Sequence, residues 1–277
     1  MLEAIFLGII QGLTEFLPIS SSAHVRIAGE FMPSASDPGA TFTAIMQIGT
    51  ELAVLFYFRN DIFAIVRASI AFLFGKRFTP GTAQRQDARI GALIALGSIP
   101  IFLLGYFGQS YIRETFRSLW LISATLIVFG LLLGLVDYLG KKSKDFKDLN
   151  GRDGLIYGLA QSLALIPGVS RSGATIAMGR LLGYKRSAAL RYSFLLALPA
   201  VFGSGLYELL NSLSEPTNTF SAVETAAATL VAFIVGYAVI AWLMKFVQAR
   251  SFMPFVIYRV TLGGLLIALL LSGRISA

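Results

Sequence analysis

The sequence contains no cysteine and only one histidine, His24, among its 277 residues. The lack of cysteine excludes disulfide bonds, thiolate nucleophiles and cysteine-bound zinc, and a single histidine cannot form a multi-histidine metal centre within one chain. Charge is also scarce, because only 14% of the residues are Asp, Glu, Lys or Arg. Any chemistry must therefore come from a few carboxylates, hydroxyls, amides and arginines, and from that one imidazole.

Apolar residues, by contrast, are abundant. They make up 56% of the chain, and the mean hydropathy of +0.73 lies far on the apolar side for a soluble protein. This composition predicts an all-α polytopic membrane protein. The net charge of +8 does not indicate a nucleic-acid partner, because the basic residues lie between apolar segments and not along one helix face. Their distribution fits the positive-inside rule of membrane proteins instead.

Two apolar segments are interrupted by small polar residues in matching positions. Residues 8–24 read GIIQGLTEFLPISSSAH, and residues 158–175 read GLAQSLALIPGVSRSGAT. Each begins as an apolar helix, meets a proline and then becomes polar within hydrophobic sequence. Because polar groups and helix breaks are costly in lipid, paired breaks in two halves of a chain indicate the working site of a membrane protein.

The repeat divides one integral membrane domain, residues 1–277, into halves at about 1–140 and 151–277. Each half has a broken segment followed by three apolar stretches of ~20 residues, the length that a bilayer requires. The broken segments lie at about 2–31 and 153–183, and the six spans at about 38–58, 88–109, 117–139, 189–211, 223–247 and 254–273. Since three is odd, re-entrant broken segments make the second half an inverted copy of the first.

The positive charges predict the orientation of this inverted repeat. Most lysines and arginines lie in residues 59–87, 140–152, 180–191 and 245–259, which the re-entrant model places on one side. By the positive-inside rule that side is cytoplasmic, so 140–152 is a basic cytoplasmic loop and both termini are periplasmic. The alternative, eight crossings, would put 59–87 and 180–191 on opposite faces, against the charge bias.

The first break carries an acid at membrane depth. Gln11 and Glu15 are four residues apart and therefore share one helix face. Such a carboxylate costs roughly 2.5 kcal/mol or more unless it meets a polar partner, so Glu15 is either paired with Arg171 or part of a metal or substrate site. We favour the site, and oxygen ligands alone predict Mg²⁺ or Ca²⁺ bound by Glu15 and Gln11. Two other acids, Glu51 and Glu208, lie within or at the edge of spans and are either neighbours of the site or interfacial residues, and we favour the second interpretation.

Three serines follow the first proline, and His24 follows them. Ser20 and Ser21 lie four and three residues before His24, so both hydroxyls can approach the imidazole if a helix restarts after Pro18. This spacing predicts a nucleophile and its base, or a nucleophilic histidine with serine donors. The alternative is that a lone histidine makes a polar packing contact. The nearby carboxylate and hydroxyls favour catalysis.

The second break, PGVSRSGAT at residues 167–175, predicts an anion site. A half-helix that begins after Gly168 would direct free N–H groups at a ligand, and Arg171 adds a fork that matches phosphate oxygens. The alternative is close helix packing with Arg171 paired to Glu15. If the two breaks meet, a diphosphate group with a hydrophobic tail is the predicted substrate. Its predicted binding residues are Ser20, Ser22, Ser170, Arg171, Ser172 and Thr175.

At these residues the chain resembles the undecaprenyl-diphosphatase family, also called the bacitracin-resistance BacA/UppP family. The family's first signature is matched by Gln11, Glu15, Pro18, Ser20, Ser21 and His24. Its second signature, PGxSRSxxT, is matched by Pro167, Gly168, Ser170, Arg171, Ser172 and Thr175. The chain departs from many members at Gln11, where they have Glu; the change keeps an oxygen ligand but removes one charge.

The resemblance implies an enzyme of the bacterial plasma membrane that hydrolyses undecaprenyl diphosphate to undecaprenyl phosphate. That reaction recycles the lipid carrier for peptidoglycan and envelope glycans and confers bacitracin resistance. The resemblance also implies a divalent cation, a site that opens to the periplasm, and Glu15, Arg171, His24 and Ser21 as catalytic residues, with His24 favoured as nucleophile over Ser21. Transporters also contain inverted repeats, so a flippase of polyprenyl phosphate lipids is the alternative function. A second copy of the chain, in a homodimer, is a further candidate partner.

Overall fold

The computed structural model describes residues 1–32, 39–115, 118–141, 143–214 and 219–275. Within these ranges the chain forms eleven α-helices and two short 3₁₀ turns, and it forms no β-strand. The prediction of an all-α membrane protein is confirmed.

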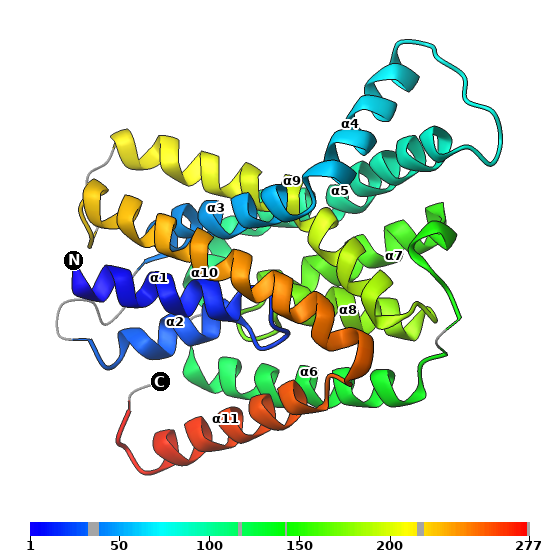
Figure 1. Ribbon diagram of the computed structural model, residues 1–277. Helices are drawn as coiled ribbons and strands as arrows, with labels where there is room; N and C mark the ends of the chain where they lie inside the picture. The colour runs from blue at the N-terminus through cyan, green and yellow to red at the C-terminus, as the bar shows by residue number, and fades with distance from the viewer. Residues whose placement is uncertain (33–38, 116–117, 142, 215–218, 276–277) are drawn as a thin grey trace.

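Two pairs of short helices contain the predicted breaks, and seven longer helices surround them (Figure 1). The first pair is α1 (Leu2–Thr14) and α2 (Ser21–Gly29), and the second is α7 (Gly151–Ser162) and α8 (Arg171–Leu181). The longer helices are α3 (Ala40–Tyr57), α4 (Arg59–Leu73), α5 (Ala83–Thr115), α6 (Leu119–Leu139), α9 (Arg186–Ser214), α10 (Ala222–Ala249) and α11 (Met253–Leu271). The 3₁₀ turns are η1 (Phe146–Asp148) and η2 (Leu163–Leu165).

Five of these helices are long and apolar enough to cross a bilayer: α5, α6, α9, α10 and α11. The bent pair of α3 and α4, with 84° between its helices, could supply a sixth crossing. Helix α1 has 13 residues and α2 has 9, and they pack against each other. At 1.5 Å per residue, neither reaches the ~30 Å of a hydrocarbon core. These lengths and the packing of α1 against α2 fit a re-entrant pair, and the six-span topology stays a prediction.

Helix α4 occupies part of residues 59–87, which the sequence analysis treated only as a basic loop. The charged residues Arg59 and Asp61 at its start make the segment unlike an apolar span. Ile65 and Ala68, three residues apart on one helix face, are nevertheless buried. Helix α4 packs against α5, and the two form a hairpin that projects from the bundle (Figure 1). The expected loop is therefore an amphipathic helical hairpin.

Each broken pair packs on a helix from the other half of the chain. A Cβ atom on Gly8 of α1 would lie 2.5 Å from the carbonyl oxygen of Ala228 in α10. In the same way, a Cβ on Gly158 of α7 would lie 2.2 Å from the carbonyl oxygen of Gly97 in α5. Only glycine allows helix backbones to come so close. The pairs approach from opposite ends of the molecule, and their breaks meet near its centre (Figure 1).

The two ends of the molecule hold different parts of the chain. The start of α1 and the end of α11 lie at one end, whereas the connections α6–α7, α8–α9 and α10–α11 lie at the other (Figure 1). Two arginines counted among the loop cations are corrected: Arg180 and Arg259 are fully buried in α8 and α11. Both arginines lie inside the predicted segments at about 153–183 and 254–273, whose ends overlapped the ranges that were counted as loops. The sidedness of the bilayer and the inversion of the repeat stay predictions.

Candidate active site

The two breaks have the same local backbone. Ser20 and Ser170 are the N-cap residues of α2 and α8, with φ of 74° and 71°, and no other non-glycine residue of the described chain has positive φ. Each serine accepts a hydrogen bond from the N–H three residues later, Ala23 at 3.4 Å and Gly173 at 3.1 Å. Such φ values cost of order 1–3 kcal/mol and concentrate at functional sites. Both helices thus start from a strained serine.

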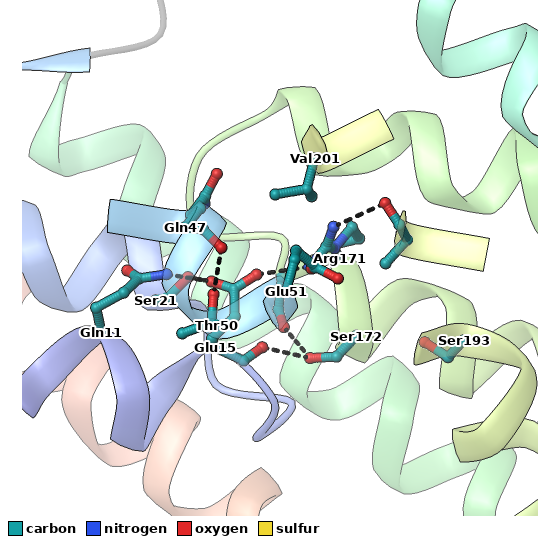
Figure 2. Close-up of polar contacts among 12 residues, drawn as sticks. Gln11, Glu15, Ser21, Gln47, Thr50, Glu51, Arg171, Ser172, Ser193 and Val201 are labelled. Carbon is teal, nitrogen blue, oxygen red and sulfur yellow. Dashed lines mark hydrogen bonds and ion pairs between the residues drawn. The ribbon is translucent and has the colours of Figure 1, made fainter. Parts of the chain in front are cut away.

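A buried ion-pair cluster joins the two breaks (Figure 2). The Arg171 Nη2 atom donates to Glu15 Oε1 at 2.7 Å and to Glu51 Oε1 at 2.6 Å. Glu51 is completely buried, and the side chains of Glu15 and Arg171 are 4% and 13% exposed. Two carboxylates therefore face one guanidinium, so Arg171 is more than neutralised by its partners.

Glu15 also binds the hydroxyl of Ser21. Its Oε2 atom accepts from Ser21 Oγ at 2.5 Å and from Gln11 Nε2 at 2.6 Å (Figure 2). The same carboxylate thus connects a hydroxyl and a guanidinium. Two buried oxygens of the cluster, Gln11 Oε1 and Glu51 Oε2, have no hydrogen-bond partner among the described residues.

The remaining hydroxyls of the second break point in different directions. Ser172 Oγ donates to the carbonyl oxygen of Leu17 at 3.1 Å and so bridges the two breaks. Ser170 Oγ lies 3.1 Å from Ser172 Oγ, as Ser20 Oγ lies 3.2 Å from Ser22 Oγ in the first break.

Thr175 is completely buried one helical turn after Arg171. Its hydroxyl donates to the Arg171 carbonyl oxygen at 2.8 Å and contacts the hydroxyl of Ser193 in α9. Thr175 therefore faces α9, away from the carboxylates.

His24 makes its contacts outside the ion-pair cluster. Its Nδ1 atom lies 2.7 Å from the Ser20 carbonyl oxygen, and its Nε2 atom lies 2.6 Å from the Tyr258 hydroxyl of α11. The rings of His24 and Tyr258 stack with centroids 5.5 Å apart. The expected hydroxyl–imidazole bond to Ser20 or Ser21 is not among the hydrogen bonds of the described residues. The helix start at Ser21 turns the imidazole towards α11 instead.

An apolar groove of about 710 Å³ adjoins this histidine. It lies between α1, α2 and α11, and Leu13, Ile27 and Leu262 are among its lining residues, with His24 and Tyr258. Apart from those two, Glu3 and Thr14, the residues that line the groove are apolar, which suits a hydrocarbon chain.

Comparisons with known proteins agree with the two signatures. The family model described as Bacitracin resistance protein BacA matches residues 4–265. The chain belongs to the BacA family. It is 59% identical to the Undecaprenyl-diphosphatase of Micrococcus luteus over 100% of this chain and 99% of that one. It is 56% identical to Undecaprenyl-diphosphatase 2 of Agrobacterium fabrum, over 100% and 98% of the two chains.

In this BacA-family chain, Glu51 is not the interfacial residue that was expected. It was interpreted as an interfacial residue, but it is buried and binds Arg171 at the centre of the cluster. A signal was available, because Glu51 interrupts the apolar run IGTELAVLF just as Glu15 interrupts its own. Glu208 is also buried, and it accepts from the Thr41 hydroxyl at 2.9 Å. Tyr258 was missed and had no signal beyond being one tyrosine in an apolar helix.

Proposed function

We propose that this chain hydrolyses undecaprenyl diphosphate to undecaprenyl phosphate and inorganic phosphate where the two breaks meet. Its membership of the BacA family and the names of its relatives support the substrate. The observation that carries the chemistry is the Glu15 carboxylate, which accepts from Ser21 Oγ through one oxygen and from Arg171 through the other. A nucleophile, its base and an anion-binding cation are thus in direct contact.

Ser21 is the nucleophile in this proposal. Glu15 Oε2 takes the hydroxyl proton as Ser21 Oγ attacks the terminal phosphorus, and the bridging P–O bond breaks to release undecaprenyl phosphate. Glu15 passes this proton to the departing undecaprenyl phosphate and is a carboxylate again. It then takes a proton from water as the water attacks the phosphoserine, and it gives that proton to Ser21 Oγ as the serine P–O bond breaks, which releases inorganic phosphate and restores the Ser21 hydroxyl. The family resemblance favoured His24 for the first step, but the 2.5 Å contact of Ser21 with Glu15 favours the serine.

Arg171 and the helix starts bind the diphosphate. The N-terminal N–H groups of α2 and α8 carry the positive ends of their helix dipoles to the breaks. Ser20, Ser22, Ser170 and Ser172 lie at those starts and supply hydroxyl donors. Arg171 donates to phosphate oxygens through N–H groups that are not bonded to its two acids, which positions the transferred group.

A divalent cation, Mg²⁺ or Ca²⁺, fits the oxygen atoms of the cluster. Gln11 Oε1 and Glu51 Oε2 are buried without a partner among the described residues, and hard cations bind such amide and carboxylate oxygens. Glu15 and Glu51 supply the negative charge that a divalent ion requires, with Gln11 as a neutral third ligand. When bound, the cation would neutralise charge on the diphosphate.

The apolar groove beside His24 holds the isoprenoid tail in this proposal. It runs along α1 and α2, which place Glu15 and Ser21 at the site, so a tail in the groove lies close to the phosphates. His24 and Tyr258 stand between the groove and the serines, where they orient the tail's phosphate end. With the predicted orientation the site opens to the periplasm, and its product re-enters envelope synthesis in a bacterial plasma membrane. Removal of undecaprenyl diphosphate in this way confers bacitracin resistance.

The decisive test is phosphate release from farnesyl and undecaprenyl diphosphate by purified protein. We expect Ser21→Ala, Glu15→Ala and Arg171→Ala each to lose activity while remaining folded. Ser123→Ala is the matched control, because Ser123 is also a buried helical serine and, among the described residues, its hydroxyl donates to the Leu119 carbonyl oxygen alone, at 2.6 Å. Phosphate release that survives the three site substitutions would refute the assignment.

Transport of polyprenyl phosphate lipids is the second candidate, favoured by the matched backbone of the two breaks. The N-cap serines of the two breaks have nearly the same φ, 74° and 71°, and the two helix pairs enter from opposite ends of the molecule. This arrangement suits alternating access to one central site. Movement of a labelled lipid phosphate across reconstituted vesicles by the Ser21→Ala protein would support transport independent of chemistry. Phosphate release by the wild-type protein without movement of the labelled lipid would support the enzyme alone.

A further inference from the structure

A second cation lies against the breaks, and the proposed chemistry does not use it. Arg259 of α11 is completely buried, and none of the salt bridges among the described residues involves it. Within the described part of the chain, all of the hydrogen bonds of its guanidinium go to backbone carbonyl oxygens. A buried charge that binds carbonyls alone is costly, so its position calls for a function.

The carbonyl oxygens that Arg259 binds belong to both breaks. Its Nη1 atom donates to Pro18 at 3.0 Å and to Val169 at 3.1 Å, and its Nη2 atom donates to Gly168 at 2.8 Å. Further bonds from Nη2 and Nε reach Thr125 at 3.2 Å and Leu126 at 3.1 Å, both in α6. One side chain therefore ties the first break to the second and both of them to α6.

These contacts lie just before the residues that act in the proposed reaction. Pro18 is three residues before Ser21, and Gly168 is three residues before Arg171. No secondary structure fixes the short segments between them, because α2 begins at Ser21 and α8 at Arg171. The separation of Ser21 from Arg171 depends on where those carbonyls are held.

The repeat provides a comparison within the chain. When α6 and α11 are aligned on their Gly-Leu-Leu runs, at residues 130–132 and 264–266, Thr125 corresponds to Arg259. Thr125 Oγ1 donates to the carbonyl oxygen of Pro167 at 2.8 Å, as Arg259 donates to that of Pro18. Each helix thus caps the proline carbonyl of one break. Only the arginine is long enough, and has enough donors, to hold both breaks at once.

We infer that Arg259 is a positioning residue for the hydrolysis: it holds the two helix breaks in register and so aligns Ser21 with Arg171. The positive charge of Arg259 also acts at the two breaks. Glu15 and Glu51 together carry one more charge than Arg171, and the charge of Arg259 offsets that excess beside an anionic substrate. The inference rests on the proposed function for its catalytic part. Its structural part, the joining of the breaks, can be measured without activity.

The test compares Arg259→Met and Arg259→Lys with Arg180→Met. Methionine keeps the length of the chain without donors, and lysine keeps the charge without the planar fork. Arg180 is the matched control, since it is equally buried in α8 but pairs with Asp137, which keeps Arg186 as a partner after the change. The readouts are kcat and KM on farnesyl diphosphate, and hydrogen exchange of backbone amides in residues 16–24 and 166–174.

We expect Arg259→Met to lower kcat by about 10²-fold, the loss typical of a displacement of about 1 Å in a reacting group. Hydrogen exchange should rise in both breaks of Arg259→Met, and Arg259→Lys should recover part of kcat. Arg180→Met should keep kcat and the exchange rates near those of the wild type. If Arg259→Met retains kcat, or if Arg180→Met loses as much, the inference is wrong. If the wild-type protein releases no phosphate, the proposed function fails. In that case hydrogen exchange at the two breaks tests the inference by itself, and exchange that is the same in Arg259→Met and the wild type overturns it. Should Arg259→Met fail to fold, Arg259→Lys gives the same comparison.

Discussion

Replacing Gln11 by glutamate should make the site dependent on a divalent cation. The Gln11 amide now donates to Glu15 Oε2 at 2.6 Å, and glutamate would put two carboxylate oxygens at that separation. Two unit charges 2.6 Å apart repel by about 6 kcal/mol at an effective dielectric constant of 20. Rotation of the side chain or uptake of a proton will relieve part of this repulsion. A remaining destabilisation of about 2 kcal/mol would lower Tm by roughly 4–8 °C.

The assay is a titration of Gln11→Glu with Mg²⁺ or Ca²⁺ after chelation, followed by Tm and phosphate release. A cation bound between the introduced carboxylate and its neighbours would remove the repulsion, so both properties should rise with the cation far more in the variant than in the wild type. Gln161→Glu is the matched control, because Gln161 is the equivalent buried glutamine of the second half and its amide has no partner among the described residues. That variant should be destabilised with or without the cation. Equal cation-induced shifts in the wild type and Gln11→Glu would refute this account of the cluster.

Three further predictions concern the site, the groove and the packing. Ser21→Ala should lower kcat by at least 10³-fold, whereas His24→Ala should lose less than about 10²-fold, the lower limit for a general acid or base; the reverse order would restore the histidine as nucleophile. Leu13→Trp should raise KM for the undecaprenyl substrate by about tenfold and leave farnesyl diphosphate unaffected. Leu131→Trp on α6, outside the groove and 55% exposed, should change neither, and an equal effect of both would argue against a tail in the groove. Gly158→Ala should cost about 1–3 kcal/mol, because its methyl group would lie 2.2 Å from a backbone oxygen of α5; an unchanged Tm would contradict the close packing.

The breaks could be predicted from the sequence because their signals are local. Pro18 and Pro167 end the first helices of the two pairs, and the serines after them have the side chain that caps the next helix. Ser20 and Ser170 proved to be those caps. The contact of Glu15 with Arg171, considered as one alternative, is present at 2.7 Å.

Glu51, Arg259 and Tyr258 could not be assigned in this way, because their roles depend on which helices pack together. Glu51 reaches Arg171 only because α3 packs against α9, beside α8. Arg259 was counted as a loop cation because an arginine near the start of an apolar helix is usually at the membrane surface. Its burial follows from the carbonyls that two distant breaks present to α11.

The packing of α1 on α10 also sets an order of events during synthesis. Gly8 and its contact Ala228 are about 220 residues apart, so at roughly 5–20 residues per second a ribosome makes α10 some 10–40 s after α1. During that interval the polar break between α1 and α2 lies in the membrane without α10 packed against α1. A newly made first half must therefore wait in the membrane or be held by the insertion machinery until the second half arrives. Production of a functional protein then depends on the last third of the chain, even though the proposed nucleophile is among its first 21 residues.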